Sequence, residues 1–198
     1  MAEAQTTAPL PSDQELVAAT QAGDRGAFEG LVSRHRAGVY GLALHLLRDP
    51  DEADEAAQEA FVRAYQLLDR YDSKREFSPW LRGIAAKVCL ESQRRWRRMS
   101  QMEELSDELV GTGGIGARED ALVVREALHT LPDQYRIPLL MFYLDDASVI
   151  DVAYALGLSL GAVRVRLQRG RELLRKKLSC MVETEVSRDG LPEGATAC

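Results

Sequence analysis

Apolar residues recur at helical spacing through most of the chain, in segments that end at Gly, Pro or Asp residues. The clearest pattern covers residues 148–178, where two apolar stripes lie on either side of Gly157. Ser148 and Ser159 are suited to cap the helices that these stripes predict, and Gly157 can adopt the left-handed conformation that ends a helix. Two short helices with so tight a turn between them predict a helix-turn-helix.

The same spacing predicts further helices, which cover residues 14–22, 27–47, 51–71, 79–98, 119–130 and 133–144. Pro50 follows the second of them and stops it, because proline cannot continue the hydrogen bonding of the preceding turn. Pro138 falls inside the last one, where it either costs little or kinks the helix. No alternation typical of strands persists, and no internal repeat is found. The predicted fold class is therefore all-α.

A change of composition divides these helices into two groups. Residues 99–118 contain four glycines and four acidic residues and show little helical periodicity, which favours a linker. The predicted helical domains are therefore residues 12–98 and residues 119–178. The two ends, residues 1–11 and 179–198, are polar and contain Pro or Gly, so we expect them to be disordered.

Composition narrows the classes of function. The chain has 198 residues, of which 45% are hydrophobic, and its net charge of −6 argues against a general nucleic-acid coat. Neither a membrane-spanning run nor a signal-peptide pattern is found, so we expect a cytoplasmic protein without direct membrane insertion. The cysteines form no CxxC or Cys/His cluster, and no Gly-rich phosphate loop or nucleophile–base set is present. We therefore expect no metal, no cofactor, no catalytic residue and no small-molecule substrate, and hence no enzyme.

The second helix of the predicted helix-turn-helix is strongly basic, since residues 160–178 hold seven Arg and Lys residues against the single Glu172. At about 100° per residue, four long side chains fall on the side away from the apolar stripe. These are Arg164, Gln168, Arg171 and Arg175. Such a helix can lie in the major groove of DNA, with donors facing base edges and flanking cations on phosphates. The alternative is a solvated basic helix end, which the helix dipole explains for Arg175 but not for Arg164.

The segment FSPWLRGIAAKVCLESQRRWRR, residues 77–98, combines aromatic residues with cations. That mixture suits stacking on unpaired bases together with neutralisation of a phosphate backbone. Trp80 either packs in the core or contacts nucleic acid, because W-L-x-x-I is also a helix packing stripe. Trp96 lies within an arginine cluster and is the better candidate for a solvent-facing side chain.

Six pieces occur in order along the chain: GDRGAFEGLV, EADEAAQEAFVRAY, FSPWLRGIAAKV, RRWRR, LPDQYRIPLLMFY and GAVRVRLQRGRELL. Together they resemble the extracytoplasmic-function group of the sigma-70 family of bacterial RNA polymerase sigma factors. The resemblance extends from about Asp13 to Leu178. It implies an all-α initiation factor whose first domain binds core RNA polymerase and melts the −10 promoter region, while its second domain reads the −35 element. It also implies two further partners, promoter DNA and an anti-sigma factor, and the latter could hold the protein near the membrane.

The resemblance also implies roles for three sets of residues. The polar side of the helix at 51–71, opposite the anchoring Phe61 and Tyr65, would bind core polymerase. Its residues are Asp54, Gln58, Glu59 and Arg63. The −10 contacts, which include a loop ahead of the helix that holds a flipped base, would come from Tyr71, Phe77, Lys87, Arg94, Arg95, Trp96, Arg97 and Arg98. The −35 contacts would come from Arg164, Val165, Gln168, Arg169, Arg171 and Arg175.

Three residues depart from the pattern of the family that the chain resembles. Lys87 stands where many relatives carry Asn, Ala162 where Thr is usual, and Asp146 where Gly is usual. Two rival functions stay open beside the sigma factor. One is a conventional helix-turn-helix regulator that binds its operator without being a polymerase subunit. The other is a structural helical adaptor, whose basic helices would show no sequence preference.

Overall fold

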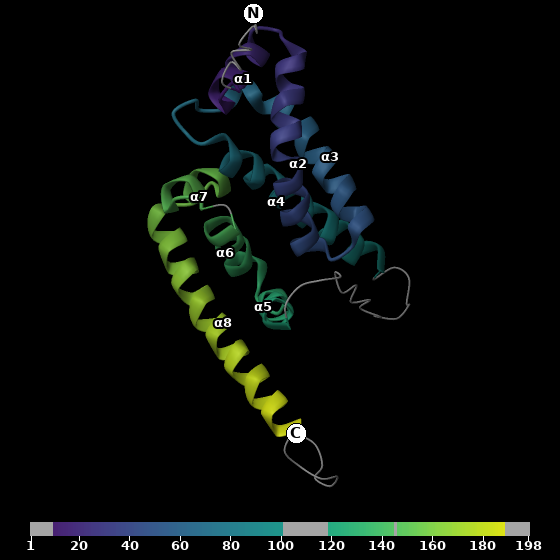
Figure 1. Ribbon diagram of the computed structural model, residues 1–198, viewed down its shortest axis with the longest axis vertical. Helices are drawn as coiled ribbons and strands as arrows, with labels where there is room; N and C mark the ends of the chain where they lie inside the picture. Colours follow the sequence, from purple (N-terminus) through teal and green to yellow (C-terminus); the bar gives the residue numbers. More distant parts are fainter. Residues whose placement is uncertain (1–9, 101–118, 145, 189–198) are drawn as a thin grey trace, which may run out of the picture. The chain divides into compact units, whose positions relative to one another are not determined.

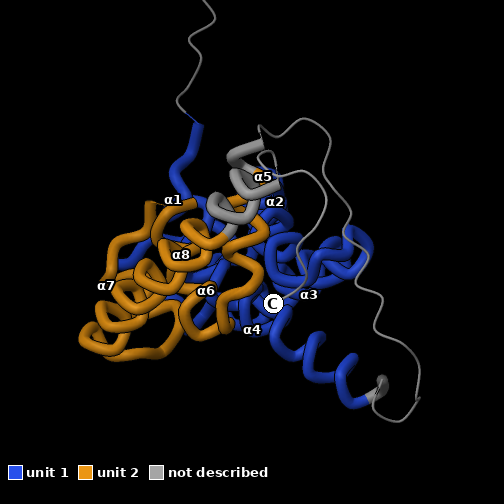
Figure 2. Tube along the Cα trace, turned by 90° about the horizontal axis from the view of Figure 1, so that it is seen from below, with its two compact units in different colours: residues 1–102 blue, residues 103–198 orange. Residues whose placement is uncertain are grey.

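The computed structural model describes residues 10–100, 119–144 and 146–188, and all regular structure within these ranges is helical (Figure 1). The chain divides into two compact units, unit 1 at residues 1–102 and unit 2 at residues 103–198 (Figure 2). The predicted all-α class is confirmed. Most of the predicted linker, at residues 101–118, lies outside the described residues.

Unit 1 contains α1 (Asp13–Gln21), α2 (Arg25–Leu47), α3 (Pro50–Leu67), the short 3-10 helix η1 (Leu68–Arg70) and α4 (Phe77–Ser100). The helices α2, α3 and α4 pack against one another, and α1 packs on α2. The inner face of α3 consists mostly of alanines, whose small side chains allow the neighbouring helices to approach closely. Leu31, Val39 and Leu81 supply larger fully buried side chains from α2 and α4. The core of unit 1 is therefore built from small residues on one helix and large ones on the other two.

The helix starts in unit 1 follow local sequence signals. Ser12 and Glu15 form a capping box at α1, in which the Glu15 amide donates to Ser12 Oγ (3.3 Å) and the Ser12 amide donates to Glu15 Oε2 (2.7 Å). Asp24 and Asp49 cap α2 and α3 by accepting hydrogen bonds from amides of the first turn. Pro50 occupies the first turn of α3, where its missing N–H leaves no bond unmade.

Unit 2 contains α5 (Glu119–His129), α6 (Asp133–Leu144), α7 (Val149–Leu156) and α8 (Leu160–Arg188). The predicted helix-turn-helix is formed by α7 and α8. Ser148 Oγ accepts a hydrogen bond from the Asp151 amide (3.2 Å), and Ser159 Oγ accepts one from the Ala162 amide (3.2 Å). Between these caps, Gly157 ends α7 with a φ of 65°, in the left-handed region that favours glycine. The helix α8 then packs on α5, α6 and α7.

Pro138 does not end α6. The helix continues from Asp133 to Leu144 with Pro138 inside it, and the proline ring is fully buried. The ring contributes to the apolar core that α6 shares with α8.

Several element boundaries differ from prediction, and α3 ends at Leu67 rather than at residue 71. The helix α4 begins at Phe77 rather than Pro79, because a proline inside the first turn loses no helical hydrogen bond. The helix α8 continues to Arg188, so the predicted disorder of residues 179–198 is wrong for residues 179–188. That stretch contains no Gly or Pro before Gly190, so nothing in it breaks a helix. Residues 189–198 and 1–9 lie outside the described residues.

Candidate nucleic-acid and protein interfaces

The outward side of α3 carries the four polar residues predicted to bind a partner, and they form two separate clusters. In the first, Gln58 Nε2 donates to Asp54 Oδ2 (2.7 Å), and Arg36 of α2 donates to Asp54 Oδ1 (3.3 Å). In the second, Arg63 Nε donates to Glu59 Oε1 (2.7 Å), and Arg63 also donates to Glu91 Oε2 of α4 (2.7 Å). These two hydrogen bonds raise the pKa of the Arg63 guanidinium. One cluster therefore lies towards α2 and the other towards α4.

Tyr65 lies on this outward side, contrary to the prediction that it anchors α3. Its side chain is 45% exposed and meets Phe28 of α2 edge to face, with ring centroids 5.0 Å apart. Val62 is exposed as well, whereas Phe61 is buried as predicted. At about 100° per residue, Tyr65 falls close to Gln58 rather than opposite it. The outward face of α3 thus combines polar clusters at its edges with two exposed apolar side chains that the sequence analysis missed.

A groove of about 280 Å³ lies between α3 and α4 beside the second cluster. Its walls carry six charged side chains, from Glu52, Glu55, Glu59, Arg63, Glu91 and Arg95. Burial raises the pKa of the Glu52 carboxyl, and the negative charges of Asp49 and Glu55 raise it further, while Arg95 acts in the opposite direction. Sequence reasoning missed Glu52 and Glu91 because their proximity depends on the packing of α4 against α3.

The aromatic residues around the start of α4 pack against one another. The Phe77 ring lies 5.6 Å from that of Tyr71 and 5.5 Å from that of Trp80, and His35 of α2 lies 5.3 Å from it. Phe77 is only 1% exposed and Tyr71 only 7%, and the Tyr71 hydroxyl donates to the Arg75 carbonyl oxygen. Both were predicted to contact DNA, and that stays a prediction; without DNA, Phe77 packs in the core and Tyr71 presents almost no surface. Trp80 joins the same cluster, so its packing role is the one observed.

The basic end of α4 is exposed, in contrast to its aromatic start. Trp96 exposes 55% of its surface, and Lys87 lies on the solvent side of the helix. The flanking cations are exposed as well: Arg94, Arg95, Arg97 and Arg98. An exposed indole among four guanidinium groups offers a stacking surface together with charges for a phosphate backbone.

The helix α8 exposes five of its six predicted contact residues, namely Arg164, Val165, Gln168, Arg169 and Arg175. Gln168 Nε2 donates to Glu172 Oε1 one turn further along (3.1 Å). Arg171 differs, because its guanidinium lies over the rings of Phe142 and Tyr143 of α6, 5.9 Å from each centroid. Its Nε is fully buried.

Arg171 is thus partly covered by α6, and its predicted contact with DNA stays a prediction. Position 171 follows the buried Gly170 and lies at the edge of the apolar stripe, close enough for a long side chain to reach α6.

Two further properties concern the described residues alone. None of their helices is both long and apolar enough to cross a membrane. Nor do their His, Cys, Asp and Glu side chains gather into a group of three or more that could hold a metal ion.

Comparison with known proteins gives matches to both units. The model of the family Sigma-70 region 2 matches residues 31–99, and that of Sigma-70, region 4 matches residues 121–174. The chain is 35% identical over 173 residues to the ECF RNA polymerase sigma factor SigW of Bacillus subtilis, covering 79% of this chain and 91% of that protein. It is 30% identical over 185 residues to the ECF RNA polymerase sigma-E factor of Escherichia coli (strain K12), covering 86% and 96%.

Solved structures give the same result at the level of the fold. The structure of CnrH in complex with the cytosolic domain of CnrY matches with a TM-score of 0.63 and 26% identity, covering 87% of this chain and 97% of that chain. The sigma factor RpoE of Bartonella quintana, in complex with the anti-sigma factor NepR, matches with a TM-score of 0.66 and 19% identity, covering 77% and 96%.

Proposed function

This chain belongs to the extracytoplasmic-function group of RNA polymerase sigma factors, and from that premise we propose how its two units divide the work of promoter recognition. Unit 1 binds core RNA polymerase and opens the −10 region, and unit 2 reads the −35 element. The observation that carries the proposal is the order of the two matched regions, each of which falls within a different compact unit. Each unit also exposes the charged residues that its role requires.

The core-polymerase surface is proposed to be the outward face of α3. Asp54, Gln58, Glu59 and Arg63 line its two edges, and the exposed Val62 lies between them. An apolar centre with a charged rim is typical of specific protein interfaces. The ion pairs within each cluster involve partly exposed groups, so they contribute little to folding and can exchange for contacts to a partner.

The −10 surface is proposed to combine the end of α4 with the loop of residues 72–76. Trp96 and the four neighbouring arginines would stack on and neutralise an unpaired strand. Lys87, exposed about two to three turns earlier, would extend this surface towards the loop. Phe77 is not included in the proposed −10 surface, because its side chain is only 1% exposed and packs beneath the loop and the start of α4.

The −35 surface is proposed to be the first three turns of α8. Arg164 and Gln168 are exposed near its N-terminal end and can each make bidentate contacts to a base edge. Val165 offers an exposed apolar contact for a thymine methyl group, and Arg169 and Arg175 supply charge for phosphates.

Two partners beyond DNA follow from the same family. Core RNA polymerase supplies the catalysis, so the chain itself needs no active site and works in the cytoplasm beside the polymerase. The Bartonella RpoE was solved in complex with the anti-sigma factor NepR, and CnrH in complex with the cytosolic domain of CnrY. By analogy we propose an anti-sigma factor for this chain, which would compete with core polymerase.

Run-off transcription tests the proposal, with purified core polymerase and a template library randomised through the −10 and −35 elements. We expect transcripts only when both proteins are present, from a restricted subset of templates. A selective DNA complex without core and no transcripts would instead identify a conventional regulator, and unselective binding would identify an adaptor. Glu59→Lys should reduce transcription and co-purification with core, whereas Glu29→Lys, an equal charge change exposed on α2, serves as its matched control.

A further inference from the structure

The helix α1 contacts the segment that connects α3 to α4 at two points, its first residue and its middle. Gln21 Nε2 donates to the Leu68 carbonyl oxygen (3.0 Å) in a partly buried position, and Gln14 Nε2 donates to the Ser73 carbonyl oxygen (3.3 Å) at the surface. The two glutamines are seven residues apart, which places them two turns apart on the same side of a helix. One face of α1 therefore spans the connecting segment.

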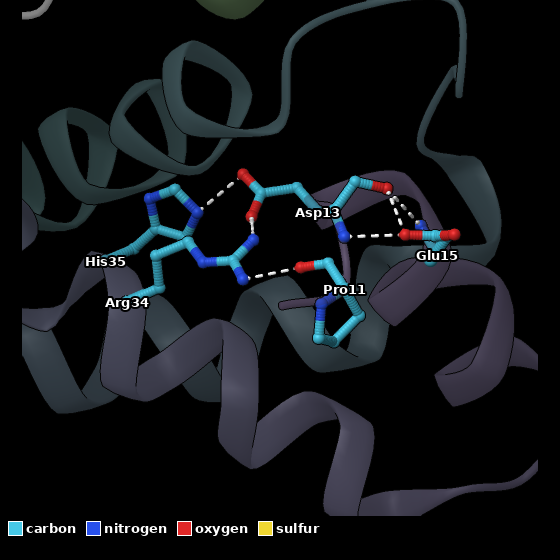
Figure 3. A network of polar contacts seen from close by, with 6 residues as sticks. Pro11, Asp13, Glu15, Arg34 and His35 are labelled. Carbon is cyan, nitrogen blue, oxygen red and sulfur yellow. Dashed lines mark hydrogen bonds and ion pairs between the residues drawn. The ribbon is translucent and has the colours of Figure 1, made fainter. Parts of the chain in front are cut away.

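A polar network fixes α1 itself to α2. The two carboxylate oxygens of Asp13 contact different residues, Oδ1 pairing with Arg34 and Oδ2 with His35 Nε2 (2.7 Å), as Figure 3 shows. Arg34 also donates to the Pro11 carbonyl oxygen (2.6 Å), so the chain ahead of α1 is held as well. The His35 ring in turn lies 5.3 Å from that of Phe77, at the start of α4. These contacts make α1 a fixed support rather than a loose terminal helix.

The loop of residues 72–76 has little apolar packing of its own. Asp72, Ser73, Lys74 and Glu76 are exposed. Its internal order comes from polar contacts, in which the Lys74 amide donates to Asp72 Oδ1 (3.0 Å) and the Arg75 amide donates to the Asp72 carbonyl oxygen (2.9 Å). An exposed loop with few apolar anchors opens at low free-energy cost, so each additional contact from outside the loop restricts it appreciably.

We infer that α1 positions this loop for its encounter with the opened −10 strand, with Gln21 and Gln14 as the positioning residues. The inference rests on the proposed role of the loop in −10 recognition. Holding the backbone at Leu68 and Ser73 presents the exposed side chains of the loop in one arrangement before DNA arrives. Such preorganisation lowers the conformational cost of contacting an unpaired strand. Because the Gln21 contact is shorter and less exposed, it carries the larger share.

Hydrogen exchange of the whole chain tests the physical part without DNA. Gln21→Ala should raise amide exchange in residues 68–76 by about three- to tenfold, the effect expected from losing one net hydrogen bond. Gln21→Glu, which keeps the shape but loses the N–H donor, should do the same, and Gln21→Lys, which keeps a donor, should restore protection. Gln93 is the matched control, because Gln93 Nε2 donates to a backbone carbonyl elsewhere in unit 1, at Leu46 (2.8 Å). Gln93→Ala should leave exchange in residues 68–76 unchanged.

The second measurement is run-off transcription from the library randomised through the −10 element, with saturating core polymerase. Gln21→Ala should flatten the −10 base preference several-fold and leave the −35 preference unchanged. Unchanged exchange in residues 68–76 would overturn the inference, whatever happens to the −10 base preference. Faster exchange with an intact −10 preference would also overturn it, while leaving the sigma-factor function in place. Absence of transcripts with the unmodified chain would count against the proposed function instead.

Discussion

Gly170 lies where α8 crosses α6, and replacing it by alanine should destabilise unit 2. A Cβ at this position would lie 2.8 Å from Leu139 Cδ1, 3.2 Å from Leu139 Cγ and 3.4 Å from Tyr135 Cβ. Leu139 is 2% exposed, so it has no free space to move into. Alanine also gains about 1 kcal/mol of helix propensity over glycine, which acts in the opposite direction. Overpacking of a tight core costs about 1–3 kcal/mol.

The difference between these two effects sets the expected result. Gly170→Ala should lower the free energy of unfolding by about 1 kcal/mol, which for a domain of this size lowers Tm by roughly 4–8 °C. Gly161 in the same helix is the matched control, because a Cβ there meets nothing within 4 Å. Gly161→Ala should gain up to about 1 kcal/mol from helix propensity alone.

Thermal unfolding of the whole chain measures both variants, with hydrogen exchange of α6 and α8 amides to assign the transition to unit 2. If Gly170→Ala stabilised the protein as much as Gly161→Ala, the helices would not be in tight contact at this position. The position of α8 against α6, and with it the orientation of the proposed −35 surface, would then need another explanation.

Four further predictions concern single side chains. The folded state raises the pKa of Glu52, so the charged carboxylate destabilises the fold above that raised pKa. This effect is absent once the pH falls below the ordinary value of 4.5, because the carboxyl is then protonated in both the folded and the unfolded state. Glu52→Gln should therefore raise Tm at neutral pH and lose that advantage in acid. Asp146 has a φ of 49°, in the left-handed region that β-branched residues avoid. Asp146→Val should therefore lower the free energy of unfolding in urea by about 1–2 kcal/mol, whereas Asp146→Gly should not. Equal effects of the two substitutions would show that backbone conformation is not the cause. Arg171→Ala should lower stability by about 0.5–1 kcal/mol, the usual value of an exposed cation–π contact, without changing the −35 preference. Arg164→Ala should change that preference instead, and a transcription library distinguishes the two outcomes.

Local signals in the sequence predicted the helices well because caps and breaks act over a few residues. Ser148, Gly157 and Ser159 each do what their chemistry predicts, since their hydrogen bonds and dihedral angles involve only neighbours in the chain. In residues 179–188 the polar composition predicts disorder, whereas the absence of Gly and Pro allows the helix to continue, and α8 does continue to Arg188. Composition describes an average tendency over a segment, whereas Gly and Pro act on the helix at a particular residue.

Side chains at the edge of a buried stripe were the ones that the sequence could not assign. Tyr65 and Arg171 both lie at such edges, and the neighbouring helix decides whether each is covered. Periodicity gives the direction of a side chain around the axis of its helix, but it does not indicate where another helix crosses. The groove that joins Glu52 to Glu91 depends on two helices at once, so no single stretch of sequence indicates it.

The same limit determines which basic and aromatic residues can carry function. Trp80 and Trp96 lie sixteen residues apart on one helix, but α4 is covered at its aromatic start and exposed at its basic end. Arg171 and Arg175 are one turn apart on α8, and Arg175 is exposed whereas α6 partly covers Arg171. The two members of each pair are the same type of residue, and the packing of neighbouring helices decides which one is covered and which one is exposed. Arg164, Gln168 and Trp96 are exposed, and loss of these side chains should change promoter choice rather than stability.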